Sequence, residues 1–267
     1  MPMKIDTILS HQVILSLFPG IDLLGRAFEA QGYCVVRGPD LLWGGDIRRF
    51  HPPRQVFWGI IAGSPCQDFS GLNRNPGDYG YEMLQEFARC VTEADPEWWL
   101  LENVARVPDC DRPGWSHQRL DINQAWYCDV TRLRHIQFGS KSGRTLNVTR
   151  CGVTDVTESA ALANDDRDFR TLCRLQGLPD DFDLPGFLVV EKKRAVGNGV
   201  PLQMGAVLAR AVADAYANQV TVQMTIDGQL IQPGTCKCGC GRPVTGKQKY
   251  YDYSCRKRAE RKRRRMR

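Results

Sequence analysis

Short runs of apolar residues alternate along the first hundred positions with segments in which apolar residues recur every three or four positions. Segments 21–32 and 81–94 have this helical spacing. The apolar runs are typical of buried strands and cover residues 12–18, 33–38, 56–62 and 97–104. Strands that alternate with helices predict βαβ units, so we expect an α/β fold with a mainly parallel sheet. Ligands of such sheets bind beyond the carboxyl ends of the strands.

The second half of the chain has a weaker pattern. Residues 139–166 are polar and weakly periodic, which predicts a loop or a small hairpin. Residues 167–177 have a helical pattern that ends at Gly177. Residues 197–220 open with Gly-Asn-Gly-Val-Pro and predict a long helix. We expect a main domain over 1–220, a linker over 221–235 with a short hairpin at Asp227-Gly228, and a tail over 236–267.

Composition changes this picture little. The chain has 267 residues, 42% of them hydrophobic and 25% charged, as is ordinary for a globular protein. No apolar run approaches the roughly 20 residues that span a bilayer, and the first residues lack the pattern of a signal peptide. We therefore expect no membrane partner and a cytoplasmic location. Seven of the eleven cysteines lie scattered, which indicates reduced thiols.

The net charge of +6 is concentrated at the C-terminus. Residues 256–267 hold nine basic residues and one acidic residue, a charge of +8, so the remaining 255 residues carry −2. Such a run favours contact with phosphates, and the alternative is a solvated tail. The candidate contacts are Arg256, Lys257, Arg258, Arg261, Lys262 and Arg263.

Four further cysteines are clustered before this basic run. They are Cys236, Cys238, Cys240 and Cys255. Four thiolates suit a closed structural zinc site, so we expect zinc here. The C-x-C-x-C spacing is tighter than the usual C-x2-C pair, and free thiols in a disordered tail are the alternative.

A cysteine within "GSPCQDFS" follows the third apolar run. Cys66 could be a nucleophile, although a cysteine after an apolar strand is by itself more often a packing residue. Glu102 follows another apolar strand, and Arg132 and Arg134 would share one face of a strand. A thiolate, a carboxyl group and paired arginines suit attack on a heteroaromatic ring that is protonated at nitrogen and held at its carbonyl.

The segment "LFPGIDLLG" has the features of a nucleotide-type cofactor loop. A strand ends at a glycine turn, Gly20, and a helix follows. Asp40, after the second strand, could hold ribose hydroxyls. Asp46 in "GGDI" could accept from an adenine amino group, or it could form a simple Asx-turn.

With these segments in order, the chain resembles the C5-cytosine-specific DNA methyltransferases over about residues 12–215. The resemblance rests on "LFPGID", "GDI", "GSPCQDFS", "ENV", "TRLRHIQFG", "FRTLCRLQGLPDDF" and "GNGVP". It implies a Rossmann-like fold that binds S-adenosylmethionine, and double-stranded DNA with a flipped cytosine as substrate. It also implies a bacterial or phage-encoded enzyme, which we expect to be a monomer.

The resemblance implies roles for individual residues. Cys66 would attack C6 of cytosine, Glu102 would protonate or hydrogen-bond N3, and Arg134 with Arg132 would bind the carbonyl oxygen. Gln67 and Ser70 would lie on a mobile loop that contacts DNA. The implied cofactor contacts are Phe18, Pro19, Gly20, Ile21, Asp22, Asp40, Asp46, Ile47, Pro65 and Asn198.

The chain departs from the family pattern at several positions. Ser16 replaces the usual Asp, Asp22 replaces a second Gly, and Val130 replaces a Gln. Only residues 140–166 are available for target recognition, which predicts a short, relaxed target. Methylation of RNA and a catalytically silent scaffold are the alternative functions.

Overall fold

The computed structural model describes residues 13–71, 73–152 and 155–217. It also describes short stretches at 223–224, 230–231, 234–235, 243–244, 249 and 256–257. The chain divides into two compact units, residues 1–215 and 216–267. We describe each unit by itself.

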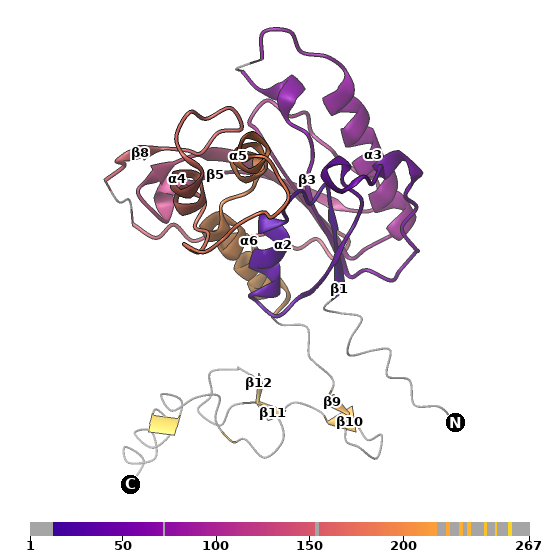
Figure 1. Cartoon of the computed structure of the whole chain (residues 1–267). Helices are drawn as coiled ribbons and strands as arrows, with labels where there is room; N and C mark the ends of the chain where they lie inside the picture. The colour runs from indigo at the N-terminus through magenta and orange to yellow at the C-terminus, as the bar shows by residue number, and fades with distance from the viewer. Residues whose placement is uncertain are drawn as a thin grey trace. The chain divides into compact units, whose positions relative to one another are not determined.

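The first unit is built on a six-stranded sheet with the order β2-β1-β3-β4-β7-β5 (Figure 1). The first four strands in this order are parallel, and β7 and β5 each run antiparallel to their neighbours. The predicted α/β fold with a mainly parallel sheet is therefore confirmed. The strands are β1 (Val13–Leu17), β2 (Cys34–Arg37), β3 (Gly59–Gly63), β4 (Trp98–Asn103), β5 (Ser116–Asn123) and β7 (Leu133–Ser140).

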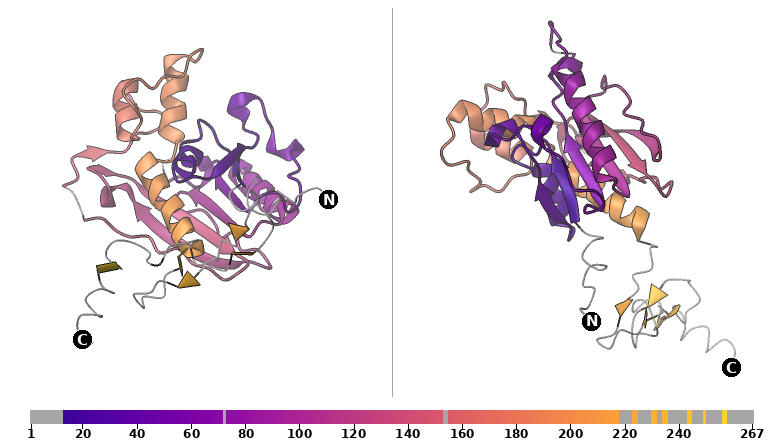
Figure 2. Two further views of the ribbon diagram at one scale, coloured as in Figure 1. Left: turned by 90° about the horizontal axis from the view of Figure 1, so that it is seen from below. Right: turned by 90° about the vertical axis from the view of Figure 1, so that its right-hand side faces the viewer.

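Helices cover both faces of the sheet (Figure 2). Helix α3 (Tyr79–Ala94) packs on one face, where Phe87 meets Trp99 edge to face with ring centroids 5.7 Å apart. Helix α2 (Leu23–Glu29) packs on the other face, where Phe28 stacks on Trp98 at 6.0 Å. Helix α6 (Leu202–Tyr216) lies beside α2, because Gly205 has no side chain to separate it from Ala27. Successive tryptophans of β4 thus anchor the two halves of the core.

Two glycines make room for these tryptophans. Gly59 of β3 pairs with Trp98, and Gly139 of β7 pairs with Trp99. A Cβ atom at either glycine would collide with the indole ring of its partner. The large side chains can therefore lie flat across the neighbouring strands, and β4 is buried along its whole length.

The remaining elements connect the sheet and cover its carboxyl edge. Helices α4 (Phe169–Leu175) and α5 (Val189–Asn198) pack together, and β6 (Val130–Thr131) pairs in parallel with β8 (Glu158–Ser159). Single turns of 3-10 helix are η1 (Leu41–Trp43), η2 (Ile47–Arg49), η3 (Gln67–Phe69) and η4 (Gln124–Trp126).

The structure differs from the sequence prediction at two places in this part of the chain. Gly197 and Asn198 end helix α5, whereas the pattern predicted that they open one long helix. The unexpected α5 begins with Val189 and Val190, both more than half exposed, so its apolar positions carry no amphipathic signal. Residues 139 and 140 belong to β7, and the described residues of 141–166 form loops, as predicted, except for β8, which pairs in parallel with β6 and not in a local hairpin.

The second unit is described only in short stretches. Strands β9 (Gln223–Met224) and β10 (Leu230–Ile231) pair antiparallel on either side of the predicted turn at 227–228 in the sequence. Strands β11 (Gly234–Thr235) and β12 (Pro243–Val244) form a second antiparallel pair. The four clustered cysteines and Arg258, Arg261, Lys262 and Arg263 lie outside the described residues. No helix in the described part of the chain is long and apolar enough to cross a bilayer.

Candidate active site

The cysteine loop begins where β3 leaves the sheet. Gly63, the last residue of β3, pairs with Glu102 of β4. The Asn103 amide then donates to the Ser64 carbonyl at 3.1 Å and to its hydroxyl at 2.9 Å. Cys66 follows with φ −105° and ψ 0°, a sparsely populated region in which many active-site residues sit. The loop is therefore fixed to the end of β4, and the predicted proximity of "SPCQ" and "ENV" is found.

A buried ion pair lies beside this loop. The Arg134 Nε atom is 2.9 Å from Glu102 Oε1, and both side chains are largely removed from solvent. Strand pairing explains the contact, because Glu102 lies opposite Ile136, two residues from Arg134 on the same face of β7. The guanidinium retains further donors, one of which bonds to the Leu133 carbonyl.

The surroundings of Cys66 control its ionisation. Burial raises the pKa of the Cys66 thiol, and the nearby Glu102 carboxylate raises it further. Arg134 and Arg132 act in the opposite direction and lower it. The thiol is thus held within the electrostatic reach of one acid and two arginines, as the three motifs predicted.

Arg132 has a different environment from Arg134. It lies between β6 and β7, is 5% exposed, and donates to the carbonyl oxygens of Ala161, Gly197 and Gly199. These bonds connect the segment after β7 with the end of α5. We therefore interpret Arg132 as a positioning residue, in place of the direct contact with the base carbonyl that the sequence suggested.

The loop that follows Cys66 is held against the start of α3 by hydrogen bonds of Asp68. The Asp68 carboxylate accepts from the Gly77 N–H at 2.8 Å and from the Gly80 N–H at 2.6 Å, and these bonds lower the pKa of Asp68. Gln67 is exposed and Ser70 is partly exposed on the same loop. Asp68 therefore ties the start of the loop to the start of α3.

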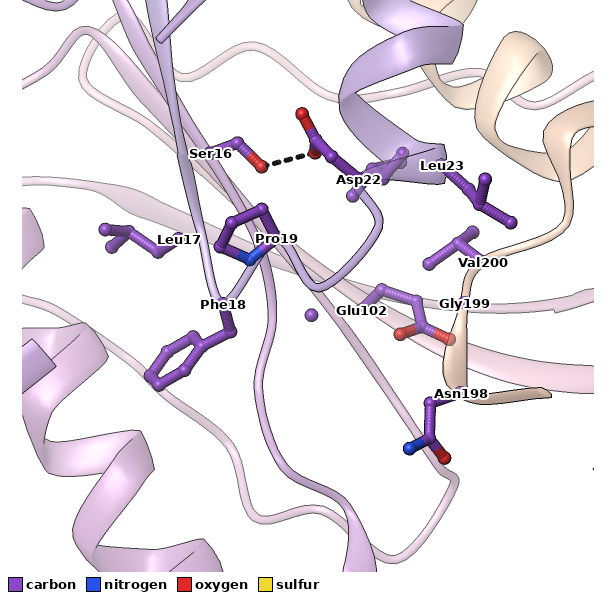
Figure 3. A pocket seen from close by; sticks show the side chains of 12 residues that line it. Ser16, Leu17, Phe18, Pro19, Asp22, Leu23, Glu102, Asn198, Gly199 and Val200 are labelled. Atoms are coloured by element: carbon purple, nitrogen blue, oxygen red, sulfur yellow. Dashed lines mark hydrogen bonds between the residues drawn. The ribbon is translucent and has the colours of Figure 1, made fainter. Parts of the chain in front are cut away.

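A pocket lies at the carboxyl edge of the sheet and is lined by four separate segments (Figure 3). The β1–α2 loop contributes Phe18, Pro19 and Asp22, β3 contributes Gly63, β4 contributes Glu102, and the end of α5 contributes Asn198. Four of the ten predicted cofactor residues are thus brought together with the predicted catalytic acid. The other six, which are not among the lining residues, are Gly20, Ile21, Asp40, Asp46, Ile47 and Pro65.

A buried carboxylate organises the cofactor loop. Asp22 is 3% exposed, accepts from Ser16 Oγ at 2.8 Å and from Gly25 N–H at 3.1 Å, and lies 2.8 Å from Arg37 Nε. Its φ of +56° is left-handed, a region that Asp tolerates better than most residues. Burial raises the pKa of Asp22, although Ser16, Arg37 and Gly25 each lower it. The two unusual residues of the loop, Ser16 and Asp22, are therefore bonded to each other.

The main chain at Gly20 is held from two sides. Its N–H donates to Asp40 Oδ2 at 2.8 Å, and its carbonyl accepts from Trp43 Nε1 at 2.6 Å. Asp40 Oδ1 also accepts from the Leu42 N–H. Asp40 thus lies against this loop with both carboxylate oxygens bonded to backbone N–H groups, and its contact with ribose hydroxyls stays a prediction.

The other predicted cofactor residues lie farther from this arrangement. Asp46 is paired with the guanidinium of Arg48 and caps η2, which corresponds to the Asx-turn alternative. Ile47 is buried in the core beneath α3, and Pro65 immediately precedes Cys66.

Sequence reasoning did not single out two residues that shape the site. Trp43 contacts the cofactor loop and is 57% exposed, and its ring meets Phe187 edge to face at 5.4 Å. Asp68 closes the cysteine loop. Trp43 could have been found from the sequence, because it is an aromatic residue only three positions after Asp40. The contacts of Asp68 could not, because they depend on how the loop returns to α3.

Metal-binding residues form no cluster of three or more within the described ranges. The predicted zinc ligands Cys236, Cys238, Cys240 and Cys255 lie outside those ranges. Arg256 and Lys257 are described and are exposed.

Comparison with known proteins adds a family to this geometry. A family model described as C-5 cytosine-specific DNA methylase matches residues 44–115. The type II methyltransferase M.HgiGI of Herpetosiphon aurantiacus is 39% identical over 49 residues, which cover 18% of this chain and 39% of that protein. The matched stretch thus spans well under half of this relative.

Solved structures share the fold across most of the chain. One is a prophage-encoded Escherichia coli protein assigned as a DNA modification methyltransferase, with a TM-score of 0.58, 13% identity, and coverage of 77% of this chain and 99% of that chain. Another is the Schizosaccharomyces pombe Dnmt2 methyltransferase, with a TM-score of 0.55, 10% identity, and coverage of 77% and 98%.

The sheet order defines a Rossmann-like α/β fold, which the chain shares with these two structures. The match over residues 44–115 includes the "GDI", "SPCQDFS" and "ENV" segments that carry the site chemistry. Over residues 44–115 the chain is therefore similar to the C-5 cytosine-specific DNA methylases.

Proposed function

We propose that the protein is an S-adenosylmethionine-dependent DNA (cytosine-5)-methyltransferase. The observation that carries this proposal is the convergence of three groups at one edge of the sheet. Glu102 is ion-paired with Arg134, is an electrostatic neighbour of the Cys66 thiol, and lines the pocket formed by the cofactor loop. A single carboxyl group therefore adjoins both the nucleophile and the cofactor pocket.

Cys66 is the nucleophile in this proposal. Its thiolate adds to C6 of the cytosine, which makes C5 electron-rich enough to accept a methyl group. After transfer, the C5 proton leaves and the C6–S bond breaks, so the ring and the thiolate are both restored. A thiol whose pKa is raised by burial must first lose its proton, and the positive charges of Arg134 and Arg132 favour that loss.

Glu102 and Arg134 stabilise the ring during the attack. Addition of the thiolate would place negative charge on the ring, and Glu102 would relieve it by protonating or hydrogen-bonding N3. Arg134 holds the Glu102 carboxyl group in place and directs its remaining N–H donors toward the carbonyl oxygen of the base. Arg132 supports both by fixing the neighbouring backbone.

The pocket residues fit the implied cofactor. S-adenosylmethionine supplies an electrophilic methyl group when it is bound. Phe18 offers an aromatic face to the pocket, and the β1–α2 loop that carries it is held from outside the pocket lining, where Asp40 and Trp43 bond to Gly20. Because a cytosine inside a duplex cannot reach Cys66, the base must be flipped out, at a cost of a few kcal/mol. Gln67 and Ser70 lie on the loop that would meet the DNA.

The tail is a separate part of the proposal. We assign residues 1–220 to the catalytic domain, 221–235 to a linker and 236–267 to a basic appendage. Cys236, Cys238 and Cys240 follow β11 and precede β12 in the sequence, and with Cys255 they form a donor set that suits zinc. The arginine-rich run would bind phosphates without reading bases.

Deletion of residues 236–267 tests the role of the tail. Binding should weaken for all DNA sequences, while turnover at saturating DNA stays close to that of the full chain. Zinc content is measured directly by elemental analysis of the purified protein. A changed target sequence after the deletion contradicts a non-specific role.

Methyl transfer to DNA and to RNA tests the proposed activity. The purified chain is incubated with radiolabelled S-adenosylmethionine and either duplex DNA or transfer RNA, with Cys66→Ser as the matched control. We expect label in DNA that depends on Cys66. Label confined to RNA identifies the RNA alternative, and no label in either substrate favours a silent scaffold.

A further inference from the structure

Target recognition must use few residues in this chain, because the segment between β7 and α4 is short. Its basic side chains are Lys141, Arg144, Arg150 and Arg167. Three of them are engaged in the fold: Lys141 with Asp95, Arg144 with the Ala215 carbonyl, and Arg167 with Asp165. Arg150 contacts an aromatic ring and has no ion pair among the described residues, whereas Lys141, which also lies over a ring, that of Trp115, is paired with Asp95.

Arg150 lies over the ring of a partly buried tryptophan. Its guanidinium carbon is 4.0 Å from the centroid of the Trp126 ring, and the Arg150 side chain is exposed. An arginine stacked in this way keeps its planar set of N–H donors at the edge, available to a ligand. No acidic side chain forms an ion pair with Arg150 among the described residues.

The ring that holds Arg150 belongs to the active-site edge of the sheet. Trp126 ends η4, which follows directly after β5. At that end of β5, Ile122 pairs with Arg134, the partner of Glu102. The Gln124 N–H also donates to the Arg132 carbonyl at 3.0 Å. The Arg150–Trp126 pair is therefore linked, through the end of β5 and its hydrogen bonds, to Arg132 and Arg134, which would hold the cytosine.

Tyr127, the residue after Trp126, carries a buried polar group without a hydrogen bond. The Tyr127 hydroxyl is buried and has no hydrogen-bond partner in the described part of the chain. Burial raises the pKa of Tyr127 to about 12, and Arg150 is a nearby charge that lowers it. A buried hydroxyl without a partner is costly in a site that serves packing alone.

We infer that Arg150, held on Trp126, reads a guanine next to the target cytosine in DNA. A planar guanidinium presents two parallel donors, which match the O6 and N7 acceptors of guanine in the major groove. The stacking on Trp126 fixes the plane of those donors before DNA arrives, so little side-chain entropy is lost on binding. This inference rests on the proposed cytosine methylation of DNA.

Methylation of a randomised duplex pool tests the inference. The pool holds a fixed cytosine flanked by several randomised base pairs, and methylated molecules are identified by sequencing. The wild-type chain should prefer guanine at one flanking position. Arg150→Lys keeps the charge but loses the planar pair of donors, and it should reduce that preference by about tenfold to a hundredfold.

Two further variants separate base reading from general effects. Trp126→Leu removes the ring and should reduce the same preference in part, whereas Arg210→Gln, at an exposed arginine of α6, should leave it unchanged. Cofactor affinity measured by calorimetry should be equal in all variants, which shows that each is folded.

The outcomes distinguish the inference from the proposed function. If Arg150→Lys retains the wild-type preference, or if it weakens methylation of all sequences equally, Arg150 contacts phosphate and the inference is overturned. If the wild-type chain methylates no member of the pool, the proposed function itself fails.

Discussion

The buried Asp22 allows a quantitative test of how the cofactor loop is built. Asp22 caps helix α2, accepts from Ser16, and adopts a left-handed backbone with φ +56°. Replacement by Ala removes the cap, which costs about 1 kcal/mol. It also forces an ordinary residue into the left-handed region, which costs roughly 1–2 kcal/mol. The Ser16 hydroxyl is then buried without its acceptor.

These contributions predict how strongly each substitution of Asp22 lowers the free energy of unfolding. The lost ion pair with Arg37 adds little because that arginine is 48% exposed, and relief of the buried carboxylate offsets part of the loss. Asp22→Ala should lower the free energy of unfolding by about 3 kcal/mol. Asp22→Gly should cost about 1 kcal/mol less than Asp22→Ala, because glycine adopts positive φ without strain. Asp22→Asn, which retains the cap, should cost least.

Gly25 provides an independent check of the same contact. A Cβ atom at Gly25 would collide with the Asp22 carboxylate. Gly25→Ala should therefore destabilise the wild-type chain but cost much less in the Asp22→Gly background. This coupling between the two positions is read from a double-mutant cycle.

Urea unfolding followed by tryptophan fluorescence measures these differences. All six tryptophans lie between residues 43 and 126, so the signal reports the unit that contains the loop. Equal stability of Asp22→Ala and Asp22→Gly would refute the role of backbone conformation. An equal cost of Gly25→Ala in both backgrounds would refute the side-chain contact.

Three further predictions concern residues around the site. Arg132→Gln should lower the free energy of unfolding by about 3 kcal/mol, because three carbonyl groups lose a charged donor. It should also weaken cofactor binding measured by calorimetry, since Gly199, one of those three residues, lines the pocket. Asp68→Ala should lower kcat several-fold with little change in KM and speed proteolysis of the cysteine loop; unchanged proteolysis would argue against the tie to α3. Burial lowers the pKa of His135, despite its bond to Asp121, so stability should be present above about pH 6.5 and fall as the pH drops below it. His135→Gln should flatten this dependence in urea titrations at pH 7.5 and 5.5, and an unchanged slope would assign it to other groups.

The four parallel strands could be predicted from the sequence because they are short, continuous apolar runs, whereas β5 was missed because most of its residues are polar. The strand over Trp98–Asn103 is buried throughout, and burial on both faces removes any alternation that could confuse its assignment. The places of Cys66 and Glu102 were also predictable, since Cys66 closely follows β3 and Glu102 lies at the end of β4, both at the carboxyl edge. Helix α5 was not, because its first turn exposes apolar side chains.

The contacts that separate Arg132 from Arg134 could not be found from spacing. Arg132 and Arg134 are two residues apart, as side chains on one face of a strand would be, but only Arg134 lies within a regular strand. Arg132 lies in the break between β6 and β7, and its carbonyl partners come from segments far along the chain. The contact between Arg150 and Trp126 could not be predicted from the sequence for the same reason. Arg150 lies in a loop without periodicity, and such a loop does not indicate which strand end it approaches.

Covalent trapping of the chain on DNA tests the central claim most directly. In an oligonucleotide with 5-fluorocytosine, C5 cannot lose its substituent after methyl transfer, so the bond between the nucleophile and C6 persists. The account predicts a denaturation-resistant adduct that requires S-adenosylmethionine, is absent for Cys66→Ser, and maps by mass spectrometry to the peptide containing Cys66. An adduct of equal yield with Cys66→Ser, or one that maps to another cysteine, would contradict it.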